Sequence, residues 1–402
     1  MTAVRSSDPL KMDLTVEESR LIADSIRFLS IEAVQRANSG HPGAPMGLAD
    51  IATAIWSQGL HFDPADATWS RRDRFVLSCG HASMLLYSLL HLCTEHLSID
   101  DIKSFRQMGS LTPGHPELGH TPGVEMTTGP LGQGCATSVG MAVAAARLDR
   151  SVVKAGGGVD HPWSAQKTVT LCSDGDLMEG ISYEAASLAG HWRLKDLIWF
   201  YDNNKISIDG ETSLSFTEDV GTRFIAMGWR VIKVDGHNIE ALNQVVDKAW
   251  TSDGRPTIVI CRTHIGFGSP NKVDSSSSHG APLGDSEIKL TREALGWTAD
   301  PFKVPAKVTK IAKSLRAHRS NSSSAWRQLE KEWAAAHPRA AEVAYQLITP
   351  ESMGYDEVLP ILIEAASNGD ATRKLSNKVL NRALELYPKL MGGSADLSGS
   401  NG

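Results

Sequence analysis

The sequence predicts an α/β protein with a doubly wound, mainly parallel sheet that has helices on both faces. Two observations carry this prediction. Short β-rich runs alternate with helical patterns between residues 168 and 262, as they do where crossover helices join parallel strands. Each run also ends in polar residues, and ligands of open α/β sheets gather beyond the carboxyl ends of the strands.

The N-terminal part of the chain is predicted to be mostly helical. A helix is expected over 15–37, because Thr15 and Glu18 form a capping-box pattern and apolar residues recur on one face. The segment "NSGHPGAP" (38–45) ends this helix with glycine and proline. Further helices are predicted over 47–58, 81–94 and 131–149.

The predicted sheet consists of four β-rich runs and the helices between them. The strands are "TVTLC" (168–172), "LIWFY" (197–201), "RVIKV" (230–234) and "TIVICR" (257–262). The helical patterns cover 179–190, 215–227 and 238–252.

The last third of the chain is more polar. The Ser- and Gly-rich stretch 271–286 is interpreted as a mobile loop over a site, or as an ordinary surface loop. Residues 305–347 are charged and predicted to be largely helical, and 348–360 are expected to form an interdomain linker. A new helix is predicted near Ala371, and 390–397 are predicted to form a strand and its end.

Composition excludes several classes of protein. The 402 residues are 41% hydrophobic and carry a formal net charge of −6, which supports a large core and argues against a general nucleic-acid binder. No window holds the roughly 18 apolar residues of a membrane span, and the N-terminus lacks the apolar region of a secretion signal. The five scattered cysteines contain no CxxC pair, so we expect no zinc site, no disulfide framework and a reducing cytoplasm.

The ends of two consecutive β-rich runs form a candidate cation site. Asp174 follows the first run, and Asp202, Asn203 and Asn204 follow the second. One βαβ unit brings these ends side by side, and carboxylate and amide oxygens suit Mg²⁺. Gly175 would let a backbone N–H approach a phosphate. The alternative is that Asp174 caps a helix and the asparagines form a turn.

Four of the fourteen histidines lie in loops rich in glycine, proline or serine, namely His41, His81, His115 and His279. Clustered imidazoles suit proton transfer and the recognition of sugar hydroxyls or phosphate. Taken singly, each setting favours an ordinary loop or core histidine over a functional one. The loop "TTGPLGQG" (127–134) precedes a helix of small residues, and such a loop suits the binding of an anion.

Nine stretches taken together resemble the transketolase family, in the same order along the chain. The resemblance runs from about residue 15 to the end of the sequence. The stretches are "SGHPGAPMGLADI", "GHASMLLYSLL", "TPGHPE", "GVEMTTGPLGQG", "DGDLMEGISYEAASLAGH", "YDNNKISIDG", "IGFGSPNK", "HGAPLG" and "GGSADL".

The resemblance implies a thiamine-diphosphate-binding fold and an activity. Transketolases use thiamine diphosphate held by Mg²⁺ or Ca²⁺, and they move a two-carbon ketol unit from a ketose phosphate to an aldose phosphate. The expected donor is of the xylulose 5-phosphate type, and the expected acceptor is of the ribose 5-phosphate or erythrose 4-phosphate type. The resemblance also implies a cytoplasmic homodimer with its active site at the subunit interface. The expected setting is the pentose phosphate pathway or the Calvin cycle, with no nucleic-acid or membrane partner.

The resemblance assigns roles to individual residues of this sequence. The implied metal ligands are Asp174, Asn204 and the backbone carbonyl of Ile206. The implied cofactor contacts are His81, Gly129, Pro130, Leu131, Gly175, Asn204, His279 and Asp396. The implied catalytic and donor-sugar residues are His41, His115 and His279, and the implied contacts to the sugar phosphate are Arg373 and Ser400.

The sequence departs from the family in two respects. The cofactor signature usually begins Gly-Asp-Gly, and here Ser173 stands in the first position, although the ligand and the second glycine remain. Asp176 and Glu179 are interpreted as first-turn acids that favour a helix N-terminus. The second departure is length, because the family's glutamate that contacts the pyrimidine ring would lie beyond Gly402.

The predicted domain organisation follows from the resemblance. It consists of a tail (1–14), a diphosphate-binding domain (15–304), a helical connector (305–354) and the beginning of a pyrimidine-binding domain (355–402). We therefore expect an N-terminal portion of a transketolase that is inactive alone and prone to association. The alternatives are dihydroxyacetone synthase, which uses formaldehyde as acceptor, and the cofactor-binding subunit of a split transketolase that needs a partner chain.

Overall fold

The centre of the protein is a five-stranded parallel sheet with the strand order β1-β2-β3-β7-β6. The computed structural model describes residues 11–349, 354–367, 369–387, 389–394 and 396–401. The strands of the sheet are Arg74–Leu77 (β1), Thr168–Ser173 (β2), Leu197–Asn203 (β3), Arg230–Asp235 (β6) and Thr257–Arg262 (β7). Two short strands, Ile206–Ser207 (β4) and Gly210–Glu211 (β5), form a separate antiparallel pair.

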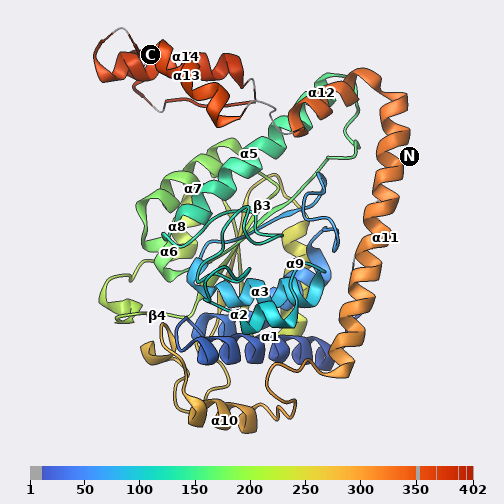
Figure 1. Cartoon of the computed structure of the whole chain (residues 1–402), viewed down its shortest axis with the longest axis vertical. Coiled ribbons are helices and arrows are strands. Elements are labelled where there is room, and N and C mark those ends of the chain that lie inside the picture. Colours follow the sequence, from blue (N-terminus) through green and yellow to red (C-terminus); the bar gives the residue numbers. More distant parts are fainter. Residues whose placement is uncertain (1–10, 350–353, 368, 388, 395, 402) are drawn as a thin grey trace.

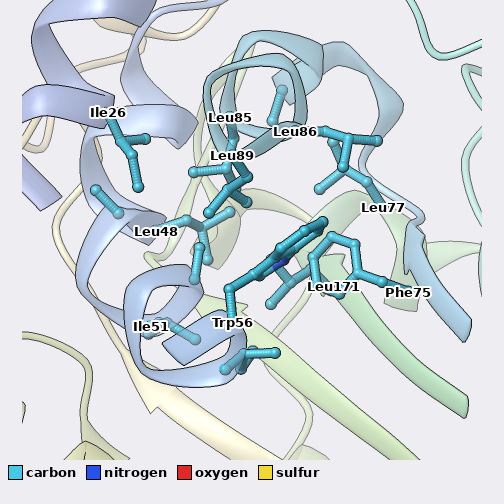
Figure 2. Packing of buried hydrophobic residues seen from close by; sticks show 14 of the residues in the cluster. Ile26, Leu48, Ile51, Trp56, Phe75, Leu77, Leu85, Leu86, Leu89 and Leu171 are labelled. Atoms are coloured by element: carbon cyan, nitrogen blue, oxygen red, sulfur yellow. The ribbon is translucent and has the colours of Figure 1, made fainter. Parts of the chain in front are cut away.

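One face of the sheet is covered by four helices, with α11 packed at their edge (Figure 1). These are Val16–Ala37 (α1), Gly43–Ala54 (α2), Ser83–Cys93 (α3), Ile239–Trp250 (α9) and Ala306–Ala336 (α11). Figure 2 shows Leu48 of α2 and Leu85 of α3 close to Trp56, with Leu77 and Leu171 of the strands beside it. Burying each such side chain contributes about 1.5–3 kcal/mol, so this layer fixes the loops that leave β1 and β2.

The opposite face carries the other helices of the doubly wound fold. These are Gln133–Lys154 (α5), Asp174–Met178 (α6), Gly180–Trp192 (α7) and Val220–Ala226 (α8). Trp199 of β3 is fully buried among Phe224 and Trp229, and its indole N–H donates to Ser138 Oγ of α5 at 3.0 Å. Alternate residues of β3 therefore serve the two cores, since Phe200 belongs to the first layer and Trp199 to the second.

Smaller elements surround these layers. They are the helices Ile99–Lys103 (α4), Asp285–Ala294 (α10), Pro338–Ile348 (α12), Tyr355–Ala365 (α13), Thr372–Leu386 (α14) and Ser398–Asn401 (α15), the π-helix Ile55–Gly59 (η1), and the 3₁₀-helices Gly80–Ala82 (η2), Thr212–Leu214 (η3) and Ser276–Ser278 (η4). In Figure 1, α11 runs along one side of the molecule, and α13 and α14 lie beyond α5. Within the described ranges, no helix is long and apolar enough to span a bilayer.

Most of the predicted elements are confirmed. Helix α1 begins after Thr15, whose hydroxyl accepts the Glu18 N–H at 3.1 Å, and it ends at Asn38 in the left-handed conformation. All four predicted strands are present, and three of them extend one or two residues further than predicted. The parallel pairing of all five strands confirms the predicted fold class.

Three predictions about elements are wrong. The sequence analysis missed β1, because its four residues follow the charged stretch "SRRD" and give only a short apolar run. The strand predicted within 390–397 is absent from the described part of that stretch, where no neighbouring strand is available to bond it. The predicted linker 348–360 is interrupted by α13, which begins at Tyr355 with Glu357 bonded back to the Gly354 N–H.

Two helices have different bounds from those predicted. The helix predicted over 47–58 begins at Gly43, since Pro42 serves as its N-cap residue, and it continues as the π-helix η1. The helix predicted over 215–227 shortens to α8, because the Asp219 side chain caps it by accepting the Thr222 N–H at 3.2 Å.

Candidate active site

The predicted cation ligand Asp174 is the first residue of α6, directly after β2. Its side chain is 2% exposed. One carboxylate oxygen accepts the Tyr201 hydroxyl, and the other accepts the Lys205 backbone N–H at 3.1 Å. Burial is the main cause that raises the pKa of Asp174 to about 7, and the nearby Asp202 carboxylate adds to it. A buried carboxylate in this position would be stabilised by a cation.

Asn204 and Ile206 lie at the end of β3, across the βαβ unit from Asp174. The Asn204 amide N–H donates to Asp202 Oδ2 at 2.8 Å, and its oxygen accepts the Ile206 N–H at 2.8 Å. The Arg262 guanidinium donates to the Asn204 carbonyl at 3.2 Å. These hydrogen bonds define the turn that leads into β4. The turn that the sequence analysis gave as an alternative for the asparagines is therefore present in the structure.

Asp202 stabilises this turn by accepting hydrogen bonds. It is 1% exposed and accepts hydrogen bonds from Thr263 Oγ1 and from the Asn204 amide. Burial raises its pKa to about 6. Among the described residues, no group of three or more His, Cys, Asp or Glu side chains is arranged to hold a metal. The predicted donor set is of a different kind, with one carboxylate, one amide and one backbone carbonyl.

The four loop histidines come together from four separate segments of the chain. His41 lies between α1 and α2, His81 in η2, His115 in the loop after α4, and His279 after η4. The His41 ring centroid lies 5.2 Å from that of His81, 6.5 Å from that of His115 and 5.8 Å from that of His279. The rings of His81 and His279 stack at 5.1 Å. We call these residues the histidine cluster.

The histidine cluster is held in the neutral form. Burial lowers the pKa of all four imidazoles, and it is the largest cause for each. The pKa of His41 falls to about 4, because His279, Arg106 and His115 also disfavour a positive charge there. The buried Nδ1 atoms of His41 and His279 have no hydrogen-bond partner in the described protein. Two ring nitrogens are therefore available to a ligand.

The loop Gly129–Leu131 connects the histidine cluster to the Asp174 turn. A Cβ atom on Gly129, whose φ is +151°, would lie 3.3 Å from the His115 ring, and a Cβ atom on Gly175 would lie 2.9 Å from Leu131 Cδ1. Gly80, next to His81, would place a Cβ atom 2.6 Å from Thr128 Oγ1. The positive φ of Gly129 and the backbone atoms that face Gly80 favour glycine at these two positions, and Gly175 packs closely against Leu131. The loop Gly129–Leu131 therefore contacts the segments of His81, His115 and Gly175.

A cavity of about 770 Å³ opens beside Asp174, at the carboxyl ends of β3, β6 and β7. Its lining includes acidic side chains as well as the basic side chains of Lys205, Lys233 and Arg262. The carboxyl ends of these strands therefore border a cavity, as the polar residues that follow the strands in the sequence suggested.

Three predicted site residues lie outside this region. Arg373 is in α14, Ser400 is in α15, and Asp396 is in the bend between them. Figure 1 shows α13 and α14 beyond α5, away from α2, α10 and β4 near the histidine cluster. The single chain does not bring Arg373, Ser400 or Asp396 to the cluster.

The sequence analysis underrated Asp176. It lies in the first turn of α6 as predicted, but it is also completely buried and accepts hydrogen bonds from three loops, which its interpretation as a first-turn acid did not include. The spacing in "SDGD" does indicate its bond to Ser173 as a capping box. Nothing in the sequence marks its contacts with Ser78 and Gly132, because they join segments 98 and 44 residues away.

Comparison with known proteins identifies the family. Residues 18–351 match the family described as transketolase, thiamine diphosphate binding domain. This chain belongs to the transketolase family. The transketolase of Halalkalibacterium halodurans is 47% identical over 388 residues, and transketolase 1 of Vibrio cholerae is 49% identical over 387 residues. These alignments cover 95% and 94% of this chain, and the chain spans about 57% of the length of each relative.

Solved transketolase structures share the fold. The transketolase of Campylobacter jejuni is 38% identical, with a TM-score of 0.81 over 96% of this chain and 58% of its own. A Pichia stipitis transketolase in complex with fructose 6-phosphate is 41% identical, with a TM-score of 0.84 over 96% of this chain and 56% of its own. The sheet and its covering helices are therefore those of a transketolase thiamine-diphosphate-binding domain.

Proposed function

We propose that the protein containing this chain transfers a two-carbon ketol unit from a ketose phosphate to an aldose phosphate. The donor is of the xylulose 5-phosphate type, and the acceptor is of the ribose 5-phosphate or erythrose 4-phosphate type. Solved Pichia stipitis transketolases are complexes with fructose 6-phosphate, xylulose 5-phosphate and sedoheptulose 7-phosphate, which supports phosphorylated sugars as substrates. The proposed setting is the pentose phosphate pathway or the Calvin cycle.

The proposed metal is Mg²⁺ or Ca²⁺, bound by Asp174, Asn204 and the backbone carbonyl of Ile206. This set offers the oxygen donors that such cations prefer. The Asn204 oxygen already accepts the Ile206 N–H at 2.8 Å, and an amide oxygen has a second lone pair for a cation. A cation here would also compensate the buried charge of Asp174, which N–H and O–H donors alone contact in the described structure.

The proposed diphosphate contacts are Gly175, His81 and His279, and the loop Gly129–Leu131 would lie beside the pyrimidine. The unpartnered Nδ1 of His279 and the close approaches at Gly129 and Gly175 support this assignment. When bound, thiamine diphosphate supplies the nucleophilic carbon and takes up the electron pair of the broken C–C bond.

The observation that carries the proposal is the histidine cluster, which lies beside the turn after β2 that we propose binds thiamine diphosphate. A neutral imidazole accepts a proton from a sugar hydroxyl at one nitrogen and donates at the other. We propose that His41, His115 and His279 orient the donor sugar and move its hydroxyl protons. Their lowered pKa values keep them able to accept protons at neutral pH.

We also propose a cytoplasmic homodimer. The described cysteines are all free and buried, which suits a reducing compartment. Ile181, Leu188 and Trp192 on α7 are between 36% and 44% exposed, and such an apolar surface favours association. In the assembled enzyme, Arg373 and Ser400 would contact the sugar phosphate and Asp396 would lie near the cofactor. Their separation from the histidine cluster in one chain supports a site shared between two copies.

The proposed domains are diphosphate-binding (15–304), connector (305–354) and the beginning of a pyrimidine-binding domain (355–402), preceded by the tail 1–14. The family match over 18–351 supports the first two of these as one cofactor-binding region.

The test is formation of sedoheptulose 7-phosphate from xylulose 5-phosphate and ribose 5-phosphate, followed by mass spectrometry. In the protein that contains this chain, we expect activity with thiamine diphosphate and Mg²⁺, and none after chelation. Asp174→Asn should weaken cofactor binding on the order of 10-fold or more, because it removes a charged ligand. The exposed Asp160→Asn should match the wild type. Turnover with formaldehyde but not ribose 5-phosphate as acceptor would contradict the proposal.

A further inference from the structure

The side chain of Asp176 joins three loops of the proposed cofactor site. Its Oδ1 accepts the Ser78 hydroxyl at 2.7 Å and the Gly132 N–H at 2.8 Å. Its Oδ2 accepts the Ser173 N–H at 2.9 Å and the Ser173 hydroxyl at 3.2 Å. The residue is 0% exposed, so these donors, rather than water, satisfy the carboxylate.

Each of the three loops carries part of the proposed site. Ser78 starts the segment that contains His81, and Gly132 follows the loop Gly129–Leu131. Ser173 directly precedes Asp174 and Gly175.

The contacts of Asp176 extend one step further. The Ser78 hydroxyl oxygen accepts the Cys135 N–H at 3.0 Å, which fixes the start of α5. The Asp176 carbonyl accepts the Ser182 hydroxyl at 2.6 Å, which ties α6 to α7.

The three loops have little freedom to find other positions. A Cβ atom on Gly134 would lie 2.5 Å from Ser78 Cα, and one on Gly132 would lie 2.9 Å from Glu179 Cβ. Gly132 itself has a φ of +80°, a conformation that glycine adopts without strain. This close packing keeps the three loops within hydrogen-bonding distance of the Asp176 carboxylate, which therefore serves as their shared acceptor.

From this junction, and resting on the proposed function, we infer that Asp176 is a positioning residue for thiamine diphosphate. It does not contact the cofactor. It holds the loops of His81, Gly129–Leu131 and Asp174 at fixed separations, so that all three loops can contact one bound thiamine diphosphate and its metal ion at the same time. Preorganisation of this kind increases affinity by removing the ordering of loops from the binding step.

The informative substitution is Asp176→Asn, which keeps the size of the side chain. A carboxylate offers acceptors on both oxygens, whereas an amide turns one of them into a donor. In either orientation of the amide, an N–H group then faces the backbone N–H of Gly132 or of Ser173. One of the three loops therefore loses its anchor.

The experiment measures thiamine diphosphate affinity by calorimetry at saturating Mg²⁺, together with the donor KM and kcat at saturating cofactor. For Asp176→Asn we expect affinity to fall by about 10-fold to 100-fold, as for groups that orient ligands from behind. The donor KM should stay within about twofold, because the sugar contacts are unchanged at saturation. The control Asp160→Asn is exposed and should match the wild type in every measurement.

Ser78→Ala provides a milder variant if Asp176→Asn fails to fold. It removes one anchor and keeps the carboxylate, so affinity should fall less, and the effects of the two substitutions should be less than additive if both variants fold. Unchanged cofactor affinity in a folded variant, with only a lower melting temperature, overturns the inference. If the wild-type protein binds no thiamine diphosphate, both the proposed function and this inference fail.

Discussion

The proposed chemistry of the site depends on imidazoles that stay neutral. His41 is the central ring, since the other three members of the cluster lie within 6.5 Å of it. The sequence marked these residues by their loop settings, but it could not separate them from ordinary loop histidines, because their neighbours come from four distant segments. The family resemblance supplied the selection, and the structure supplies the distances.

Substitution of His115 should impair use of the donor sugar. We expect His115→Ala to lower kcat/KM for the ketose phosphate on the order of 10²-fold, the usual contribution of a positioned acid or base. Cofactor affinity should change less, because His115 is proposed to contact the donor sugar, whereas the proposed diphosphate contacts are Gly175, His81 and His279. Steady-state kinetics with xylulose 5-phosphate measures the effect. His120→Ala, an exposed residue of the same loop, is the control, and equal kinetics for the two variants would remove the assigned role.

The lowered pKa of His41 predicts a pH dependence of stability. In the folded protein its pKa is about 4, compared with 6.5 when solvated. Below pH 6.5 the unfolded chain therefore binds a proton that the folded chain does not bind, so stability is lost as the pH falls towards 4. Burial is the main cause of this lowered pKa, and His279, Arg106 and His115 act in the same direction, while no acid is among the causes of the shift.

The measurement is urea unfolding between about pH 8 and about pH 4.5. His41→Gln should lose less stability across this range than the wild type, since it removes one of the titrating groups. His191→Gln, on the exposed side of α7, should leave the slope unchanged. Parallel profiles for wild type and His41→Gln would contradict the prediction.

At the scale of elements, prediction from sequence succeeded where a segment is both long and buried. The residues of β2, β3 and β7 are almost all buried, because parallel strands in the middle of a sheet are covered on both faces. The strand predicted within 390–397 is absent from the described part of that stretch, since a strand forms only where a neighbouring strand can hydrogen-bond to it. Asp176 shows the same limit at the site, because its meaning depends on Ser78 and Gly132, which only the fold brings near.

Helix α7 offers a test of packing against the segment that follows α8. Gly190 lies where α7 crosses the carbonyl of Met227, and a Cβ atom there would overlap that oxygen. Gly190→Ala should therefore destabilise the protein by about 1–3 kcal/mol, as overpacked cores do. Gly140→Ala in α5 meets nothing within 4 Å, so it should instead stabilise by up to ~1 kcal/mol through helix propensity. Urea unfolding measures both, and equal shifts would contradict the assigned packing.

At the scale of the whole molecule, the proposed homodimer can be tested at exposed apolar residues of α7. Leu188 on α7 is 41% exposed and lies between Ile181 and Trp192. We expect Leu188→Arg to shift the protein towards monomer in sedimentation velocity, because a charge in an apolar interface is costly. Leu290 on α10 is similarly exposed at 38%. Leu290→Arg should keep the wild-type distribution, and identical behaviour of the two variants would place the contact elsewhere.

The pairing of β1 with β2 has a consequence for the order of folding. Arg74 pairs with Thr168, although more than ninety residues separate them along the chain. His81, His115 and the loop Gly129–Leu131 all lie inside that intervening stretch. Closing so long a loop is slow in comparison with forming local helices. During refolding, helical signal should therefore return before the protein can bind its cofactor, and an early intermediate would be compact but unable to bind.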